Sequence, residues 1–211
     1  MAFKKFNGKN HQVKVQTPEG EAMWCSLKSP ATYPGDDKSN YKLEQFLSKE
    51  EAQPLRDQAD SLLAGLTSDN PKARLAPFSP FQDLDDGRVL VKMKTPHFEA
   101  NDKYAATEPI PVHLWNEETE EYDEVDWSKT DWEVGNGSII KVGGYLRPYQ
   151  HPQGLGVSFR ISVVVVNKLE KYRAGASTSE FNDMITTGNK DTSKKKDPLA
   201  SGEVGQPSAD F

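Results

Sequence analysis

Cationic and aromatic residues alternate along one stretch of the sequence in a way that suits ligand binding. Lys141, Tyr145, Arg147 and Tyr149 occupy alternate positions of IIKVGGYLRPYQ. Alternate residues of a β-strand point to the same face, so these side chains are expected to lie together. Arg160 falls on the polar side of the next apolar run and is expected to join them. Cations neutralise phosphates and exposed rings stack on bases, so this pattern favours a single-stranded nucleic acid.

A second stretch carries cations on its expected outer side. In RVLVKMKT, the alternation predicts Arg88, Lys92 and Lys94 on the outer face of a strand. The apolar residues between them are predicted to face the core: Val89, Val91 and Met93. More than one strand is therefore predicted to present cations to solvent, which suits a polyanionic ligand.

The same side chains also fit a surface that binds something other than nucleic acid. Tyr145 and Tyr149, with Trp115 and Trp24, would form a flat aromatic surface on a protein- or carbohydrate-binding β-barrel. Tyrosine and arginine are also ordinary on solvated strand faces, where cross-strand pairing alone favours them. A carbohydrate surface needs no row of cations, so the lysines and arginines favour phosphates. The sequence pattern alone leaves both interpretations open.

No motif in the sequence calls for catalysis or for a cofactor. There is no Gly-x-x-x-x-Gly-Lys loop and no nucleophile elbow, and the histidines and Cys25 are not spaced as metal ligands. Asp85, Asp86 and Glu99 would make a carboxylate set for a metal ion, but DLDDGR is more simply a turn in which Gly87 takes a positive φ. GNGS is interpreted as another hairpin turn, because no helix follows it. We predict a protein that is not an enzyme and uses neither metal nor cofactor.

Composition predicts a soluble domain with a polar extension. Of 211 residues, 35% are hydrophobic and 27% are charged, which is a low apolar share for a fully packed chain. Cys25 is the one cysteine, so no intramolecular disulfide can form, and a reducing compartment is expected. No apolar run approaches the length of a membrane span and no signal peptide is visible. We expect a cytoplasmic protein without a membrane partner.

The net charge of −6 conceals an uneven distribution. Residues 117–126 (EETEEYDEVD) hold seven acids and no base, and residues 180–211 hold six acids and four lysines. Without these two segments the rest of the chain carries a net charge of about +3. The acidic total therefore does not argue against a basic groove.

Short alternating runs between turn residues predict an all-β domain with one inserted α-helix, arranged as a five-stranded OB-fold barrel. The helix is predicted to begin after Ser48, because Ser48 and Glu51 fit a capping box. Apolar residues then recur at helical spacing: Leu55, Ala59, Leu62 and Leu66. Gly65 is the predicted helix terminator. We expect the helix to cover the core.

The long hairpin is predicted to close the barrel with its apolar face. Core positions on its first strand are Ile140, Val142 and Leu146. Core positions on its second strand are Val157, Phe159, Ile161, Val163 and Val165. Residues 151–156 (HPQGLG) are the predicted loop. A folded domain is thus expected over residues 1–172, and a flexible tail over 173–211 ends in Asp210 and Phe211.

Taken together, these features resemble the single-stranded DNA-binding proteins of short-tailed lytic bacteriophages, which have an OB-fold with an inserted helix and an aromatic C-terminus. The resemblance rests on NYKLEQFLSKEE, DDGRVLVKMKT, NGSIIKVGGYLRPYQHPQGLGVSFRISVVVVNKLEKY and the terminal DF. It covers residues 20–172 in order, plus the last two residues. None of these motifs is diagnostic alone, but their order and spacing agree.

The resemblance implies roles for particular residues. Lys141 and Tyr149 match a basic and an aromatic position of the family's DNA-contacting strand, and Lys92 and Lys94 match a basic strand. Phe211 matches the terminal phenylalanine, which in the family contacts replication partners and competes with DNA. The resemblance also implies the function of the whole protein, which would coat single-stranded DNA during phage DNA replication, recombination and repair in the cytoplasm of the infected bacterial host.

The resemblance implies these partners: single-stranded DNA and, through the tail, a phage DNA polymerase and a helicase/primase. A homodimer is also compatible with it.

This sequence departs from the family in two ways that bear on these expectations. Family tails are strongly acidic, whereas this one includes Lys194, Lys195 and Lys196, and Gly143 replaces an expected basic residue. Tail-mediated autoinhibition, and dimerisation through an acidic tail, are therefore in doubt for this chain.

Overall fold

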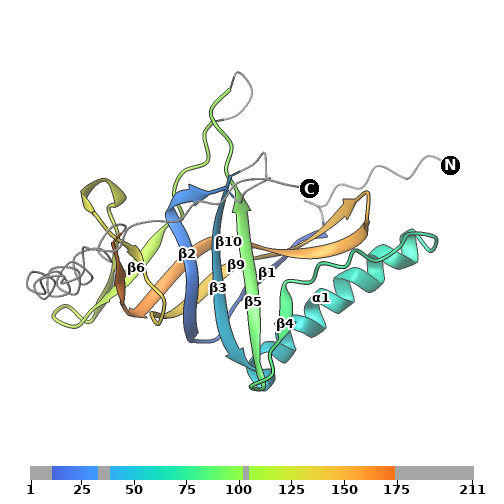
Figure 1. Ribbon diagram of the computed structural model, residues 1–211, viewed down its shortest axis with the longest axis horizontal. Helices are drawn as coiled ribbons and strands as arrows, with labels where there is room; N and C mark the ends of the chain where they lie inside the picture. The colour runs from blue at the N-terminus through green and yellow to red at the C-terminus, as the bar shows by residue number, and fades with distance from the viewer. Residues whose placement is uncertain (1–10, 33–38, 102–104, 174–211) are drawn as a thin grey trace, which may run out of the picture. The chain divides into compact units, whose positions relative to one another are not determined.

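Five strands form a closed ring in the computed structural model, which describes residues 11–32, 39–101 and 105–173. In ring order they are β2 (Gly20–Ala31), β3 (Asn40–Ser48), β5 (Arg88–Pro96), β10 (Gly154–Lys168) and β9 (Ile139–His151), and β9 pairs again with β2. All of these pairings are antiparallel except β5 with β10, which is parallel. The ring, with one α-helix inserted between β3 and β5, is the predicted OB-fold (Figure 1).

Shorter elements extend the ring at its edges. β1 (Val13–Gln16) pairs with β9, β4 (Phe81–Asp83) pairs with β5, and β6 (Val112–Asn116) pairs with β10. Beyond β6 lies β7 (Glu121–Glu124), and a second small sheet joins β8 (Glu133–Val134) to β11 (Lys171–Tyr172). A short 3-10 helix, η2 (Trp127–Lys129), precedes β8.

The helix α1 (Lys49–Asp69) begins as predicted but ends later. Ser48 is its N-cap, and the reciprocal hydrogen bonds of the capping box with Glu51 are both present. Gly65 does not end the helix, because the chain continues for another turn to Asn70, whose backbone N–H donates to the Leu66 carbonyl at 3.1 Å. Burial of Leu66 on the apolar stripe outweighs the roughly 1 kcal/mol cost of glycine inside a helix. Leu55 and Ala59 of the stripe belong to the core cluster, and α1 contacts β9 and β10.

Alternation along the hairpin holds for most of its length and then shifts by one residue. The predicted core residues of β9 and Val157, Phe159 and Ile161 of β10 are buried. A β-bulge between Ile161 and Val163 inserts an extra residue, so the predicted burial of Val163 and Val165 is wrong, and Val164 and Val166 are buried in their place. A bulge places two residues of one strand opposite one of its partner, which reverses the faces of all that follow.

The loop between the two strands is much shorter than predicted. The pairing continues to His151 and Gly154, which leaves Pro152 and Gln153 as the turn in place of residues 151–156. The segment that follows α1 bonds to this end of the hairpin: the backbone N–H of Leu155 donates to the Arg74 carbonyl at 2.8 Å. This hydrogen bond from outside the hairpin satisfies the backbone of Leu155, so the strand stays regular almost to the turn.

The acidic segment and the turn before β5 are both exposed to solvent. Residues 117–126 form the turn after β6, the strand β7 and the two residues that follow it, and all of them except Val125 are exposed. Gly87 has φ +85° in the turn before β5, and Asp86 of the same turn forms an ion pair with Arg88 at 2.7 Å. No helix among the described residues is long and apolar enough to cross a membrane. The predicted tail, with Asp210 and Phe211, lies outside the described residues beyond Arg173.

Candidate functional site

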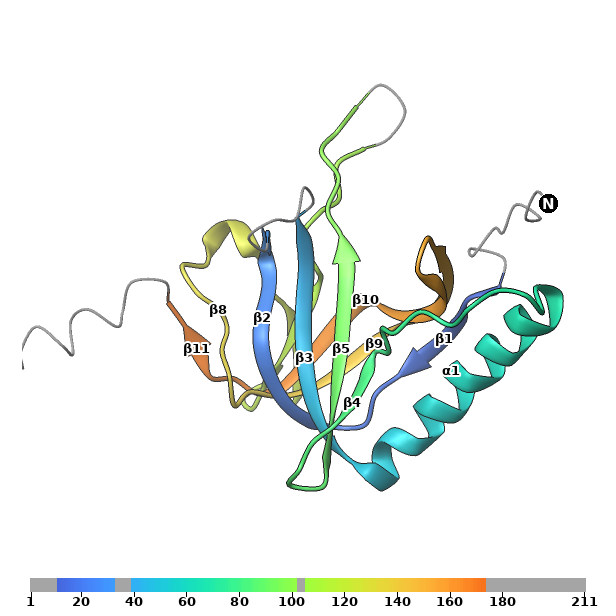
Figure 2. The same cartoon turned by 45° about the vertical axis from the view of Figure 1, so that its right-hand side comes forward.

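A groove of about 1250 Å³ runs along the outer face of the β9–β10 hairpin. Four segments that are distant in sequence form it: the hairpin itself, Gln12 before β1, residues 72–74 after α1, and the end of β5 with the loop that follows. Figure 2 shows the segment after α1 passing the end of the hairpin. Its lining includes these cationic, aromatic and hydroxyl side chains: Lys72, Arg74, Tyr145, Arg147, Tyr149, Ser158 and Arg160.

The floor of the groove is the cationic and aromatic face predicted from the alternation. Arg160 of β10 pairs with Tyr145 of β9, and Ser158 pairs with Arg147. Paired residues of an antiparallel ladder project on the same side of the sheet. The expectation that Arg160 joins the face of Tyr145, Arg147 and Tyr149 is confirmed as geometry. All four side chains line the groove.

Arg160 is the most unusual residue of this surface. Burial, with a smaller contribution from the neighbouring Arg147 guanidinium, lowers the pKa of Arg160 to about 10. It therefore remains protonated at neutral pH. Its Nε and Nη1 atoms are buried and make no hydrogen bond to any described residue. A partly buried cation whose donors are unpaired is unfavourable, whereas a phosphate bound in the groove would compensate its charge.

Tyr149 is held flat against a glycine of the opposite strand. Gly156 pairs with Tyr149, and a Cβ at Gly156 would lie 2.5 Å from the phenol ring. The Tyr149 hydroxyl donates a long hydrogen bond of 3.4 Å to the Phe78 carbonyl, and burial raises the pKa of the phenol. The ring is thus a neutral, half-buried platform whose orientation is fixed before any ligand binds, as base stacking requires.

Two cations of the groove wall escaped the sequence analysis. Lys72 and Arg74 follow α1 in a stretch without periodicity, and only pairing in space brings them to the hairpin. Leu75 forms a bridge with Leu155, and the Ala76 N–H donates to the Leu155 carbonyl at 2.7 Å. Gly154 permits this approach, because a Cβ there would lie 2.5 Å from the Arg74 carbonyl oxygen.

Charge in the groove has one sign. Its lining residues, all within the described part of the chain, include Lys72, Arg74, Arg147 and Arg160 but no aspartate or glutamate. The protein as a whole has a net charge of −6. A concave surface lined by a single sign of charge concentrates the field and attracts counter-ions of the opposite sign.

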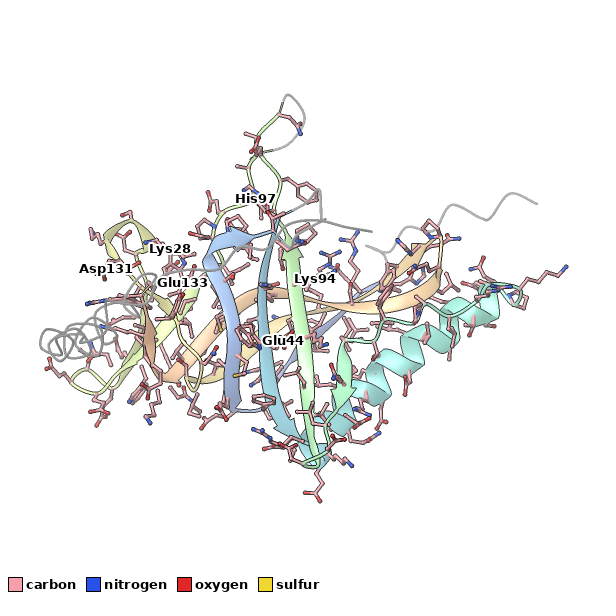
Figure 3. All side chains as sticks on the ribbon, in the orientation of Figure 1. Lys28, Glu44, Lys94, His97, Asp131 and Glu133 are labelled. Carbon is pink, nitrogen blue, oxygen red and sulfur yellow. The ribbon has the colours of Figure 1, made fainter. Side chains whose placement is uncertain are left out.

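The three predicted lysines lie outside the groove, at different places. Lys94 lies on the outer face of β5, and because Met93 pairs with Phe159, Lys94 neighbours Arg160 across the two strands. Lys92 is exposed on the same face and pairs in register with Glu44 of β3. Figure 3 shows Lys94 and Glu44 on these adjacent strands.

Lys141 shares the outer face of β9 with Tyr145 but does not line the groove. Its ammonium group lies 3.8 Å from the Glu19 carboxylate, which balances its charge within the protein. The alternation of the sequence predicted the face of β9 on which Lys141 lies. It could not predict the ion pair, because Glu19 is far from Lys141 in sequence.

The exposed aromatic residues do not form one flat surface. Tyr145 and Tyr149 lie in the groove, whereas Trp115 packs edge-on against Tyr122 on the acidic hairpin, with ring centroids 5.1 Å apart. Trp24 lies at a separate cleft beside β11. The continuous aromatic platform of the alternative interpretation is therefore absent from the described residues.

The described residues form an OB-fold barrel with one inserted helix and a groove without acidic lining residues. Solved structures of this fold include the single-stranded DNA-binding protein gp2.5 of bacteriophage T7, which has a TM-score of 0.56 and 17% identity, with 90% of this chain and 100% of that chain covered. The single-stranded DNA-binding protein of bacteriophage Enc34 is also similar, as a C-terminal truncation with a TM-score of 0.51 and 15% identity over 78% of this chain and 90% of that chain.

The Enc34 protein in complex with single-stranded DNA matches with a TM-score of 0.50 and 16% identity over 79% of this chain and 91% of that chain. The scan against protein-family models found no match, and the search of curated proteins found no significant one. The likeness thus lies in the three-dimensional fold, which is the fold that the sequence resemblance implied.

Proposed function

We propose that this protein binds single-stranded DNA in the groove along the β9–β10 hairpin, without sequence preference. The observation that carries the proposal is Arg160, a partly buried guanidinium whose Nε and Nη1 atoms are unpaired, in an acid-free groove that Tyr145 and Tyr149 also line. A phosphate fits the guanidinium and a base fits the phenol rings. A neighbour of the same fold was solved in complex with single-stranded DNA, which supports this ligand.

The chemistry of the groove explains why the ligand would be single-stranded and of any sequence. Stacking uses the face of a base, which is exposed only when the strand is unpaired, and every base has such a face. Phosphate contacts carry no sequence information. Arg147, Arg160, Lys72 and Arg74 are placed for phosphates, and Lys94 extends this set onto β5.

The wider role follows from the ligand. The protein would coat and protect single-stranded DNA during phage DNA replication, recombination and repair in the cytoplasm of the infected host, without enzymatic activity of its own. Asp210 and Phe211 would contact replication partners, a phage DNA polymerase and a helicase/primase, and a homodimer is compatible with this role. Deleting Phe211 and measuring binding to each partner tests the tail separately from DNA binding.

A salt titration of binding to a fluorescent oligothymidylate tests the main proposal. The logarithm of the affinity should fall linearly with the logarithm of salt concentration, with a slope of about −0.7 for each neutralised phosphate. Duplex DNA of the same length should bind more weakly. An affinity for oligothymidylate that does not change with salt would overturn the proposal and favour the protein- or carbohydrate-binding alternative.

A further inference from the structure

A second cleft, of about 450 Å³, is lined by residues of β2, β3 and β11 and by the turn after β8. Trp24 of β2 and Tyr172 of β11 line it, and both rings are unusually open to solvent, with 60% and 57% of their surface exposed. Lys42 of β3 and Lys171 of β11 also line it. The cleft therefore repeats the combination of aromatic rings and cations found in the groove.

The backbone of Trp24 is in a conformation that tryptophan rarely adopts. Its φ is +50°, in the left-handed region, where a bulky side chain is an outlier. It lies in an irregularity of the pairing between β2 and β3, where the register shifts between Met23 and Ser26. Outliers of this kind persist only where the surroundings impose them, and they gather at functional sites.

The surroundings that impose this conformation are the GNGS turn at residues 135–138. The Asn136 side chain accepts a hydrogen bond from the Trp24 backbone N–H at 2.8 Å, and the Gly137 N–H donates to the Ala22 carbonyl at 3.0 Å. The Gly135 N–H in turn donates to the Glu170 carbonyl at 2.7 Å, next to β11. The turn thus fixes an exposed indole that contributes little to the core.

A line of cations leads from this cleft to the groove. Lys42 pairs in register with Lys94 across β3 and β5, and Lys94 neighbours Arg160 across β5 and β10. Arg160 pairs with Tyr145 in the groove. Like charges directly opposite each other destabilise a sheet, so such a row favours an anionic ligand that lies across the strands.

Two acidic residues, Glu170 and Glu44, lie near the cleft and the cations beside it. Glu170 lines the cleft, and its carboxylate lies 3.4 Å from the Lys168 ammonium group. Glu44 lies on the same face of β3 as Lys42, one step further along, in register with Lys92 (Figure 3). The row from Lys42 to Arg160 therefore passes beside this acid and does not include it.

We infer that the cleft between Trp24 and Tyr172 is a second nucleobase-binding site, reached by a single strand that leaves the groove across β5 and β3. A base stacks on the indole, and its phosphates contact Lys42 and Lys171. This inference rests on the proposed binding of single-stranded DNA in the groove. It assigns to Trp24 and to the GNGS turn a role in extending the length of strand that one protein molecule holds.

The test compares short and long strands. Trp24→Gly removes the ring and suits the left-handed backbone, so the variant should fold with an unchanged or raised melting temperature. Its affinity for an oligothymidylate of about 16 nucleotides should fall about fivefold or more, while its affinity for one of about 4 nucleotides stays unchanged. Trp24→Phe should retain most of the affinity for the long strand, because it keeps a ring that can stack.

Trp115→Ala is the matched control, since it removes an exposed tryptophan from the acidic hairpin and should change neither affinity. The inference is overturned if Trp24→Gly binds the long strand as tightly as the unmodified protein, or loses affinity for both strands equally. Failure of the proposed function looks different: the unmodified protein would bind neither strand in a salt-dependent way.

Discussion

At the scale of single residues, Arg160 decides how the groove is interpreted. Its position on the polar face was predictable, but its burial and its unpaired Nε and Nη1 atoms were not. A surface arginine would be consistent with any solvated sheet. A partly buried one beside Arg147, with its pKa lowered to about 10, is less favourable for the free protein than for a complex with an anion.

This contrast predicts that stability and binding respond in opposite directions when the charge is removed. Arg160→Met keeps the volume and deletes the unpaired charge, so the free energy of unfolding should stay the same or rise. The affinity for oligothymidylate should fall at least about tenfold, because a charge-assisted hydrogen bond is lost. Urea unfolding and fluorescence anisotropy measure the two quantities.

Arg88→Met provides the comparison, because Arg88 is exposed, ion-paired with Asp86 and placed over the Phe46 ring, away from the groove. It should leave DNA binding intact. Equal losses of affinity in the Arg88 and Arg160 variants would contradict the assignment of Arg160 to a phosphate.

Tyr149 and Lys141 are predicted to contribute differently to the affinity for DNA, although both match contact positions of the family that the sequence resembles. Tyr149→Ala removes a ring that the structure holds in the groove and should lower the affinity for oligothymidylate by roughly 1–3 kcal/mol. Lys141→Ala removes a charge that Glu19 already balances, so its effect should be smaller. A larger effect for Lys141 would move the path of the strand toward the start of β9.

At the scale of elements, the groove depends on the contact between the hairpin and the segment after α1. The hairpin alone supplies the floor. The wall, with Lys72 and Arg74, is attached through the backbone bonds of Leu155 to Arg74 and Ala76. Gly154 allows this attachment, since its φ is +139° and its missing side chain leaves room for the Arg74 carbonyl.

Gly154→Ala is therefore predicted to detach the wall. The substitution combines an unfavourable φ with a backbone clash at 2.5 Å, and it should lower the free energy of unfolding by about 1–3 kcal/mol. Hydrogen exchange should quicken at Leu155 and Ala76. Gly65→Ala is the control: its Cβ would meet no atom within 4 Å inside α1, and it should stabilise the protein by roughly 0.5–1 kcal/mol.

At the scale of the whole molecule, the most acidic segment of the described chain and the groove lie on different elements. The acids of residues 117–126 lie on the β6–β7 hairpin, whereas the groove has no carboxylate in its lining. A chain with a net charge of −6 can therefore present a basic surface to a polyanion. If the groove binds single-stranded DNA as proposed, the acidic hairpin would also repel the strand and so orient its approach.

The tail is predicted to have little influence on DNA affinity. Residues 174–211 carry a net charge of only −2, so they are a weak competitor for the groove. A chain that ends at Arg173 keeps every helix and strand described above and should bind oligothymidylate about as tightly as the full chain in the same anisotropy assay. A marked gain in affinity would show that the tail competes with DNA.

Features with a local cause were determined by the sequence alone. The faces of β5 and β9 follow from the two-residue period of a strand, the start of α1 follows from Ser48 and Glu51, and the exposed acidic hairpin follows from its charge. The five-stranded barrel was predicted from the order of these elements and its likeness to a known family. The strand faces, the start of α1 and the exposure of the acidic hairpin each depend on backbone geometry or on residues a few positions apart.

Features with a distant cause were decided by the tertiary structure. The bulge after Ile161 exchanged the faces of the valines, and burial carried α1 past Gly65 to Asn70. The wall of the groove, the ion pair of Lys141 with Glu19 and the unpaired donors of Arg160 join segments that no local pattern links. The period of the sequence predicts the face of the strand on which a side chain lies. The partners of that side chain come from other strands and loops. These partners determine its charge state and whether it is available to a ligand.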